Sequence, residues 1–200
     1  MRIFSFLLIS LLYVGSIQVK AQNSVIHFDV IFGGKSIGTL SASKEVNGTH
    51  VVKNLRSNTD AKVLMISVHV ESEVHVKSEG EIITSATAYR HANRGAEDIE
   101  TTTTKEKGNT YTIVKNGEHI SLTHVGIKFC VTDLYFKEPL GITSVYSSTY
   151  GAFLQVKYQS KGVYKIILPD GKSTVFTYVD GKLTQAVATM SLGDIIFKRK

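Results

Sequence analysis

The stretch Tyr111–Leu122, YTIVKNGEHISL, decides the fold class. Its centre is Asn116-Gly117, a pair that tolerates positive φ at both positions and therefore favours a two-residue hairpin turn. A turn there predicts three opposing pairs: Lys115 with Glu118, Ile113 with Ile120, and Tyr111 with Leu122. All three fall on one face, with an ion pair next to the turn and apolar pairs beyond it. Because a one-residue slip would break every pair, the stretch predicts an antiparallel hairpin in this register.

The same two-residue alternation continues outward in both directions, from Ser24 to the last strand before the C-terminus. Gly-containing turns interrupt it every eight to twelve residues or so, which is typical of an antiparallel sheet built from hairpins. At Asp180-Gly181 a turn predicts Tyr178 opposite Leu183, and Thr177 opposite Thr184. We therefore expect an all-β fold with one large, strongly curved antiparallel sheet, either a half-barrel or a closed barrel.

One segment departs from this alternation. Between Thr123 and Pro139, apolar residues recur at helical spacing, and Lys137-Glu138-Pro139 would end a helix. The spacing predicts one short helix of two or three turns, inserted late in a β chain.

The N-terminus has the order of an export signal. Met1-Arg2 is followed by an apolar run from Ile3 to Ile17, and Val19-Lys20-Ala21 offers small residues at the −3 and −1 positions. We expect residues 1–21 to be a signal peptide and residues 22–200 a single β domain. The mature protein would then not span a membrane, and would lie in the periplasm or outside a Gram-negative cell.

Composition excludes several classes of function. Removal of residues 1–21 leaves 21 Lys and Arg against 17 Asp and Glu, and the basic residues cluster only at the C-terminus, which argues against nucleic-acid binding. The single cysteine, Cys130, lies between Phe129 and Val131 and is expected to be a buried thiol. No cofactor or nucleophile motif is present, so no catalytic residue is assigned.

The strongest candidate for chemistry is His69-Val70-Glu71-Ser72-Glu73-Val74-His75. In a strand, His69, Glu71, Glu73 and His75 share one face. Residues two apart lie about 6.6 Å from one another along a strand, too far for one strand to supply all the ligands of a zinc ion. A metal held by His69 or His75 would need ligands from another strand, such as His91 or His50. The alternative is an ordinary solvated face.

Three stretches are similar to a group of secreted bacterial β proteins of unknown function. They are Phe28–Leu40, Tyr111–Gly117 and Leu134–Pro139, spread over much of the mature chain. This resemblance implies an all-β fold and carries over no catalytic residue. More distantly, a curved antiparallel sheet covered by a helix resembles the half-barrels of periplasmic lipoprotein carriers and lipid-binding proteins, at the level of fold alone.

The leading hypothesis is a non-catalytic periplasmic or secreted binding module without a cofactor. Its curved sheet would hold a lipid or other apolar ligand in a groove lined by Phe28, Val30 and Ile113, with Leu134 and Phe136 on a helical lid. Two alternatives stay open. One is a metal-dependent enzyme that uses the His69–His75 face, and the other is a structural protein that interacts with the envelope.

Overall fold

The computed structural model describes residues 22–63, 66–94 and 97–200, which form fourteen strands and one short 3-10 helix. The predicted signal peptide lies outside these residues. The helix is η1 (Val131–Tyr135), between β8 and β9. The strands are β1 (Gln22–Phe32), β2 (Lys35–Asn47), β3 (His50–Val63), β4 (Ile66–Glu79), β5 (Ile82–Ala92), β6 (Ile99–Lys105), β7 (Tyr111–Lys115), β8 (Glu118–Leu122), β9 (Ser144–Ser147), β10 (Ala152–Ser160), β11 (Val163–Ile167), β12 (Ser173–Val179), β13 (Lys182–Met190) and β14 (Gly193–Arg199).

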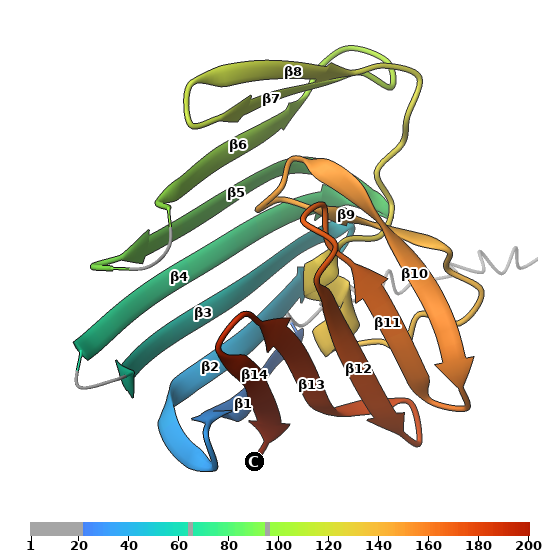
Figure 1. The fold of residues 1–200 in the computed structure, drawn as a ribbon. Coiled ribbons are helices and arrows are strands. Elements are labelled where there is room, and N and C mark those ends of the chain that lie inside the picture. The colour runs from blue at the N-terminus through green and yellow to red at the C-terminus, as the bar shows by residue number, and fades with distance from the viewer. Residues whose placement is uncertain (1–21, 64–65, 95–96) are drawn as a thin grey trace, which may run out of the picture.

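All fourteen strands belong to one antiparallel sheet, in the order β8-β7-β6-β5-β4-β3-β2-β1-β14-β13-β12-β11-β10-β9. The first and last strands meet in the middle of it, where Val30 lies opposite Phe197 and Ile31 opposite Ile196. This seam joins an N-terminal half, β1–β8, to a C-terminal half, β9–β14 (Figure 1). The predicted all-β antiparallel sheet is confirmed.

The sheet is open. Its two edges are β8 and β9, and no strand pairing joins them in the described part of the chain. The closed barrel, one of the two predicted forms, is therefore wrong. The segment between β8 and β9 instead runs through the space between the two halves of the sheet (Figure 1).

The hairpin at Asn116-Gly117 has the predicted register. Lys115 pairs with Glu118, and the two apolar pairs follow as expected. Both turn residues have positive φ, 48° and 85°. The predicted ion pair is wrong, because the salt bridges among the described residues do not include Lys115 with Glu118. The Lys115 ammonium instead lies 5.8 Å from the centre of the Tyr150 ring, close enough for a cation–π contact.

The hairpin at Asp180-Gly181 is confirmed at its first pair and wrong at its second. Tyr178 lies opposite Leu183, but a bulge follows, so Thr177 lies opposite Gln185. Thr184 remains a neighbour of Thr177, because its hydroxyl donates a 3.0 Å hydrogen bond to the Thr177 carbonyl. A bulge adds one residue to one strand only, which the alternation of side chains does not reveal.

The segment that crosses the interior, residues 123–143, is less helical than predicted. Its helix is the five-residue η1, a single 3-10 turn. At its start the Cys130 N–H donates to Asp133 Oδ2 at 3.0 Å. β-Branched Val131 and Thr132 favour extended structure over a longer helix. Of the described residues, none belongs to a helix long and apolar enough to cross a bilayer.

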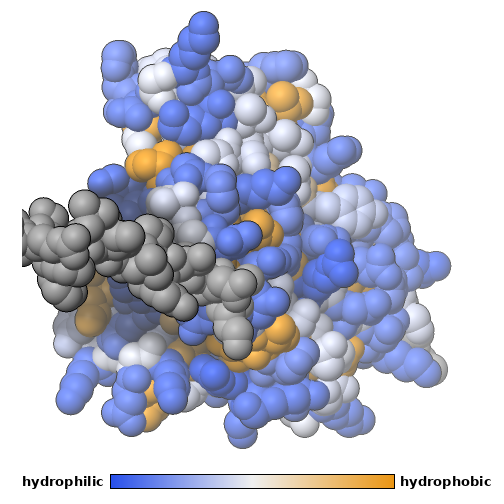
Figure 2. Space-filling model, turned by 180° about the vertical axis from the view of Figure 1, so that it is seen from behind, coloured by the Kyte–Doolittle hydropathy of each residue, from blue (hydrophilic) through white to orange (hydrophobic). Residues whose placement is uncertain are grey.

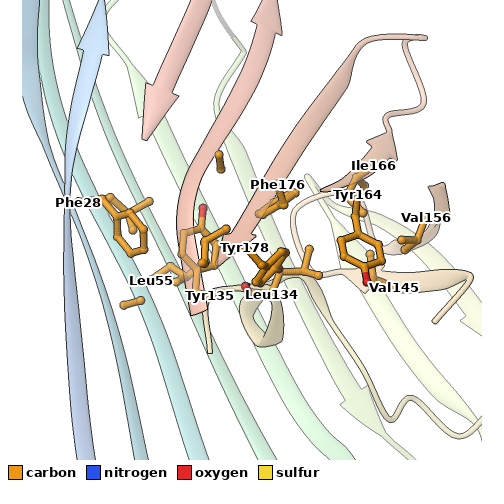
Figure 3. Close-up of a cluster of buried hydrophobic side chains, with 14 of the residues drawn as sticks. Phe28, Leu55, Leu134, Tyr135, Val145, Val156, Tyr164, Ile166, Phe176 and Tyr178 are labelled. Atoms are coloured by element: carbon orange, nitrogen blue, oxygen red, sulfur yellow. The ribbon is translucent and has the colours of Figure 1, made fainter. Parts of the chain in front are cut away.

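The crossing segment is packed into a main cluster of apolar side chains between the two halves of the sheet (Figure 3). The ring of Tyr135 meets Phe28 of β1 and Phe176 of β12 edge to face, at centroid distances of 5.5 and 6.2 Å. The Tyr178 hydroxyl donates to the Leu134 carbonyl at 2.7 Å. The buried members of the cluster are Phe28, Val30, Leu40, Ala42, Leu55, Leu134, Tyr135, Val145, Leu154, Val156, Tyr164, Ile166, Phe176, Tyr178, Leu183 and Ala186.

A second group of apolar side chains, the edge cluster, lies where the curved sheet brings the N-terminal half against the edge strand β9. Tyr146 of β9 packs there with residues of β4, β5 and β7, and its hydroxyl lies 2.7 Å from Oγ1 of Thr103 on β6. Gly151, after β9, leaves no room for a side chain, since a Cβ there would lie 2.9 Å from Ile113 Cγ2. The buried members are Val76, Ile83, Ala86, Tyr111, Ile113, Ile127, Cys130 and Tyr146.

A polar clasp of Lys53, Asp133 and Cys130 ties the crossing segment to β3. Lys53 Nζ lies 2.5 Å from Asp133 Oδ1, and the two side chains are only 7% and 16% exposed. The Cys130 thiol donates to Asp133 Oδ2 at 3.1 Å. Burial raises the pKa of this thiol to about 12. The prediction of a buried thiol is confirmed, and the thiol stays protonated and unreactive at neutral pH.

Candidate functional site

The five residues predicted to line an apolar groove lie in the packed interior. Phe28, Val30 and Leu134 belong to the main cluster, and Phe136 packs against it, half-buried. Ile113 belongs to the edge cluster. The structure thus divides them between two clusters, and the crossing segment fills the space where a ligand would lie. Their role in ligand binding stays a prediction, which now requires that segment to move.

The opposite, outer face of the N-terminal half carries two adjoining hollows. The first, of about 370 Å³, is lined by Thr39, Ser41, Arg56, Ser57, Asn58, Glu71, Ser72, Glu73 and Tyr89. The second, of about 560 Å³, is lined by Tyr89, Asp98, Ile99, Glu100, Thr102, Val114, Asn116 and Gly117. Because Tyr89 belongs to both, we call them together the Tyr89 groove.

The pleat of the sheet places polar side chains in this groove. Four residues lie in one row across β2–β5: Ser41, Arg56, Glu73 and Tyr89. Their neighbours Ala42, Leu55 and Ala88 are buried on the other face, because successive residues of a strand point to opposite sides. Viewed from behind, the molecule is mainly hydrophilic, with apolar residues in separate patches (Figure 2).

Several side chains of the groove are held by their neighbours. Arg56 donates to Glu73 Oε1 from both Nε, at 3.0 Å, and Nη2, at 2.9 Å. Glu71 Oε1 lies 3.2 Å from His69 Nε2, and His91 Nδ1 lies 3.0 Å from both oxygens of Asp98. These contacts fix donors and acceptors before any ligand arrives, which lowers the entropy lost on binding.

The comparisons with known proteins give one result. A family model described as a domain of unknown function (DUF6134) matches residues 28–200. The chain belongs to this family. The predicted resemblance to uncharacterised β proteins is therefore confirmed. No curated protein and no solved structure gives a match, so the analogy of this DUF6134 chain with lipid-binding half-barrels stays an analogy.

The four-residue histidine face of the DUF6134 chain lies on one side of β4, as predicted, but its members are not gathered round one point. His69 is held by Asp60 at 2.8 Å and by Glu71, whereas the His75 ring contacts Asn54. Across residues 22–63, 66–94 and 97–200, no three His, Cys, Asp or Glu side chains are grouped to hold a metal ion. The hypothesis of a metal-dependent enzyme gains no support from this face.

We expect these two histidines of the DUF6134 chain to titrate in opposite directions from their ordinary pKa of 6.5. The hydrogen bond to the Asp60 carboxylate, then that to Glu71, raises the pKa of His69. Burial, then the charge of Lys77, lowers the pKa of His75. Histidine Cε1–H signals in NMR spectra should give one midpoint above and one below 6.5. Asp60→Asn should lower the first and leave the second in place, and equal midpoints would contradict the described contacts.

The shifted pKa values also determine how each histidine makes the folding stability depend on pH, because protonation is linked to folding. His69 binds its proton more tightly when folded, so its contribution is complete below pH 6.5 and is lost as the pH rises through the raised pKa. His75 prefers to be neutral when folded, so its contribution is complete above pH 6.5 and is lost as the pH falls towards the lowered pKa.

Sequence reasoning missed Tyr89, the residue at the centre of the groove in this DUF6134 chain. The sequence does hold a signal, because Tyr89 is a large aromatic residue at an outward position between the buried Ala88 and the half-buried Arg90. Its neighbours in space, Arg56 and Thr102, come from other strands, so the groove appears only once the registers are known.

Proposed function

We propose that the protein is an exported, non-catalytic binding module that holds a hydroxyl-rich ligand, of the carbohydrate class, in the Tyr89 groove. The observation that carries the proposal is the pair of adjoining hollows, lined by both polar and apolar side chains, that share one exposed aromatic ring. Tyr89 is 49% exposed. The other residues of the first hollow all carry hydrogen-bonding side chains, and the second hollow adds the apolar Ile99 and Val114.

The chemistry of the groove suits such a ligand. A sugar ring presents hydroxyls at its rim, which both donate and accept hydrogen bonds, and C–H groups on its faces. Asn58, Asn116 and the carboxylates supply donors and acceptors, and the Tyr89 ring offers a flat apolar surface with a polar tip. The volume of each hollow, about 370 and 560 Å³, is in the range of roughly 300–1,000 Å³ common for ligand sites.

An apolar ligand inside the sheet is the rival within the same function class. It would require residues 123–143 to leave the main cluster, exposing Leu134 and breaking the Lys53–Asp133 pair. The exposed surface of the Tyr89 groove needs no such rearrangement. Because binding in the interior would require this rearrangement and binding in the Tyr89 groove would not, the groove is the favoured ligand site.

Calorimetric titration with soluble oligosaccharides of the starch, cellulose and chitin types tests the proposal. We expect saturable binding of at least one type, weakened about fivefold by Tyr89→Ala, because loss of an aromatic contact costs roughly 1 kcal/mol. The matched control is Tyr158→Ala, which removes a tyrosine that is 66% exposed on β10.

Three results would refute this proposal: no binding of any oligosaccharide, equal affinity of the Tyr89→Ala variant and the parent, or an equal loss in the control. Saturable uptake of a fluorescent fatty acid, with no sugar binding, would place the ligand in the interior instead.

A further inference from the structure

The outer face of the C-terminal half, together with the adjoining strand β1 across the seam, is unlike the outer face that carries the Tyr89 groove. One row across β1, β14, β13 and β12 consists of branched apolar residues: Ile31, Ile196, Val187 and Val175. Their neighbours Val30, Ala186 and Phe176 point into the main cluster, so this row points away from the core. Its members are half-buried and pack against no residue of either cluster. The solvent side of an antiparallel sheet is ordinarily polar, so a continuous apolar row there indicates a contact surface.

Lysines extend the same row. Beyond Val175 come Lys165 on β11 and then Lys157 on β10, and Lys198 lies on the same face of β14, two residues from Ile196. Of the two acidic side chains on this face, Asp29 is already bound by Lys200 at 2.9 Å, and Asp194 lies at the start of β14, beyond the row.

The net charge of the C-terminal half is positive, in agreement with the lysines that extend the apolar row. Residues 144–200, which form β9–β14, carry eight Lys and Arg against three Asp and Glu. Residues 22–143 carry thirteen Lys and Arg against fourteen Asp and Glu. The positive charge of the described chain is therefore concentrated on the side that bears the apolar row.

We propose that this basic–apolar face, defined by Ile31, Val175, Val187, Ile196, Lys157 and Lys165, docks on an anionic lipid surface. Lysine side chains reach further from a sheet than valine or isoleucine, so their ammonium groups would contact lipid phosphates while the apolar row rests at the interface. The Tyr89 groove, on the other half of the sheet, would remain open to solvent.

Charge complementarity selects this occupant over a second copy of the chain. A symmetric dimer through this face would appose two copies of the same positively charged surface, and like-charged surfaces repel each other. A lipid surface of opposite charge instead meets every lysine of the face with an attractive partner.

Co-sedimentation with vesicles tests the inference. We expect the protein to bind vesicles of phosphatidylglycerol mixed with phosphatidylcholine, to bind phosphatidylcholine vesicles far more weakly, and to be released by high salt. Lys165→Gln and Lys157→Gln should each weaken binding about fivefold, since one lysine near an anionic surface contributes roughly that factor. Val187→Asn should weaken it as well, with an unchanged circular dichroism spectrum.

The matched control is Lys107→Gln, which removes the same charge from an exposed position in the turn between β6 and β7. Absence of binding to the anionic vesicles would overturn the inference. So would an equal loss for Lys107→Gln, which would mean that net charge alone acts, or full binding by the Val187→Asn variant. Concentration-dependent dimerisation through Val187 without vesicle binding would assign the face to a second copy instead.

Discussion

Replacement of Asp133 by alanine is expected to lower the free energy of unfolding by about 3–5 kcal/mol, the range for removal of one partner from a buried ion pair. The change leaves the Lys53 ammonium, whose side chain is 7% exposed, without its carboxylate. It also removes the acceptor of the Cys130 N–H and thiol. Urea denaturation of purified protein measures the loss, and Glu45→Ala, at an exposed position of β2, should change stability by less than about 0.5 kcal/mol.

A double variant distinguishes the electrostatic contribution of the Lys53–Asp133 pair from the packing of its side chains. Lys53→Met combined with Asp133→Leu removes both charges and keeps apolar volume, so it should recover most of the stability lost in Asp133→Ala. A cost below about 1 kcal/mol for Asp133→Ala would instead mean that water reaches Lys53 and that the crossing segment is not clasped to β3 as described.

Replacement of Phe28 by alanine is expected to cost about 3–5 kcal/mol, as for other fully buried aromatic residues. Phe28 has no exposed surface and contacts the Tyr135 ring edge to face at 5.5 Å, so its loss leaves a cavity between β1 and the crossing segment. Thermal unfolding followed by circular dichroism measures the effect. Val25→Ala, on the same strand but at a residue 58% exposed, is the matched control and should be nearly neutral.

The Phe28 variant also separates two roles for this residue. A core residue loses stability when truncated, whereas a residue that lines an open groove would lose ligand binding at little cost in stability. A stable Phe28→Ala protein with altered uptake of fatty acid would therefore restore the groove inside the sheet as the binding site.

Local sequence was sufficient to predict much of the sheet, because a two-residue turn together with the alternation of side chains determines the register of a hairpin. The register at Asn116-Gly117 follows from the turn alone and is confirmed. The register after Asp180-Gly181 depends on a bulge, which no pattern of apolar residues marks, and one predicted pair there is wrong.

The candidate sites were less predictable, because each depends on contacts between distant strands. That His69, Glu71, Glu73 and His75 share a face follows from alternation, but the partners of the two histidines depend on how β3 pairs with β4. The interior was predicted as a groove with a lid. Whether the crossing segment covers a cavity or fills it depends on how tightly the sheet rolls, which is a property of packing rather than of periodicity.

The seam between β1 and β14 constrains the order in which the polypeptide can fold. The Lys200 N–H donates to the carbonyl of His27, so residues 173 positions apart in the sequence must come together before the sheet is continuous. Until β14 has been synthesised, β1 is paired with β2 on one side only, and the apolar side of the N-terminal half lacks the C-terminal half that covers it. In that interval the unpaired edge of β1 and the uncovered apolar surface favour aggregation, since long-range strand pairing is slow and exposed apolar surface aggregates.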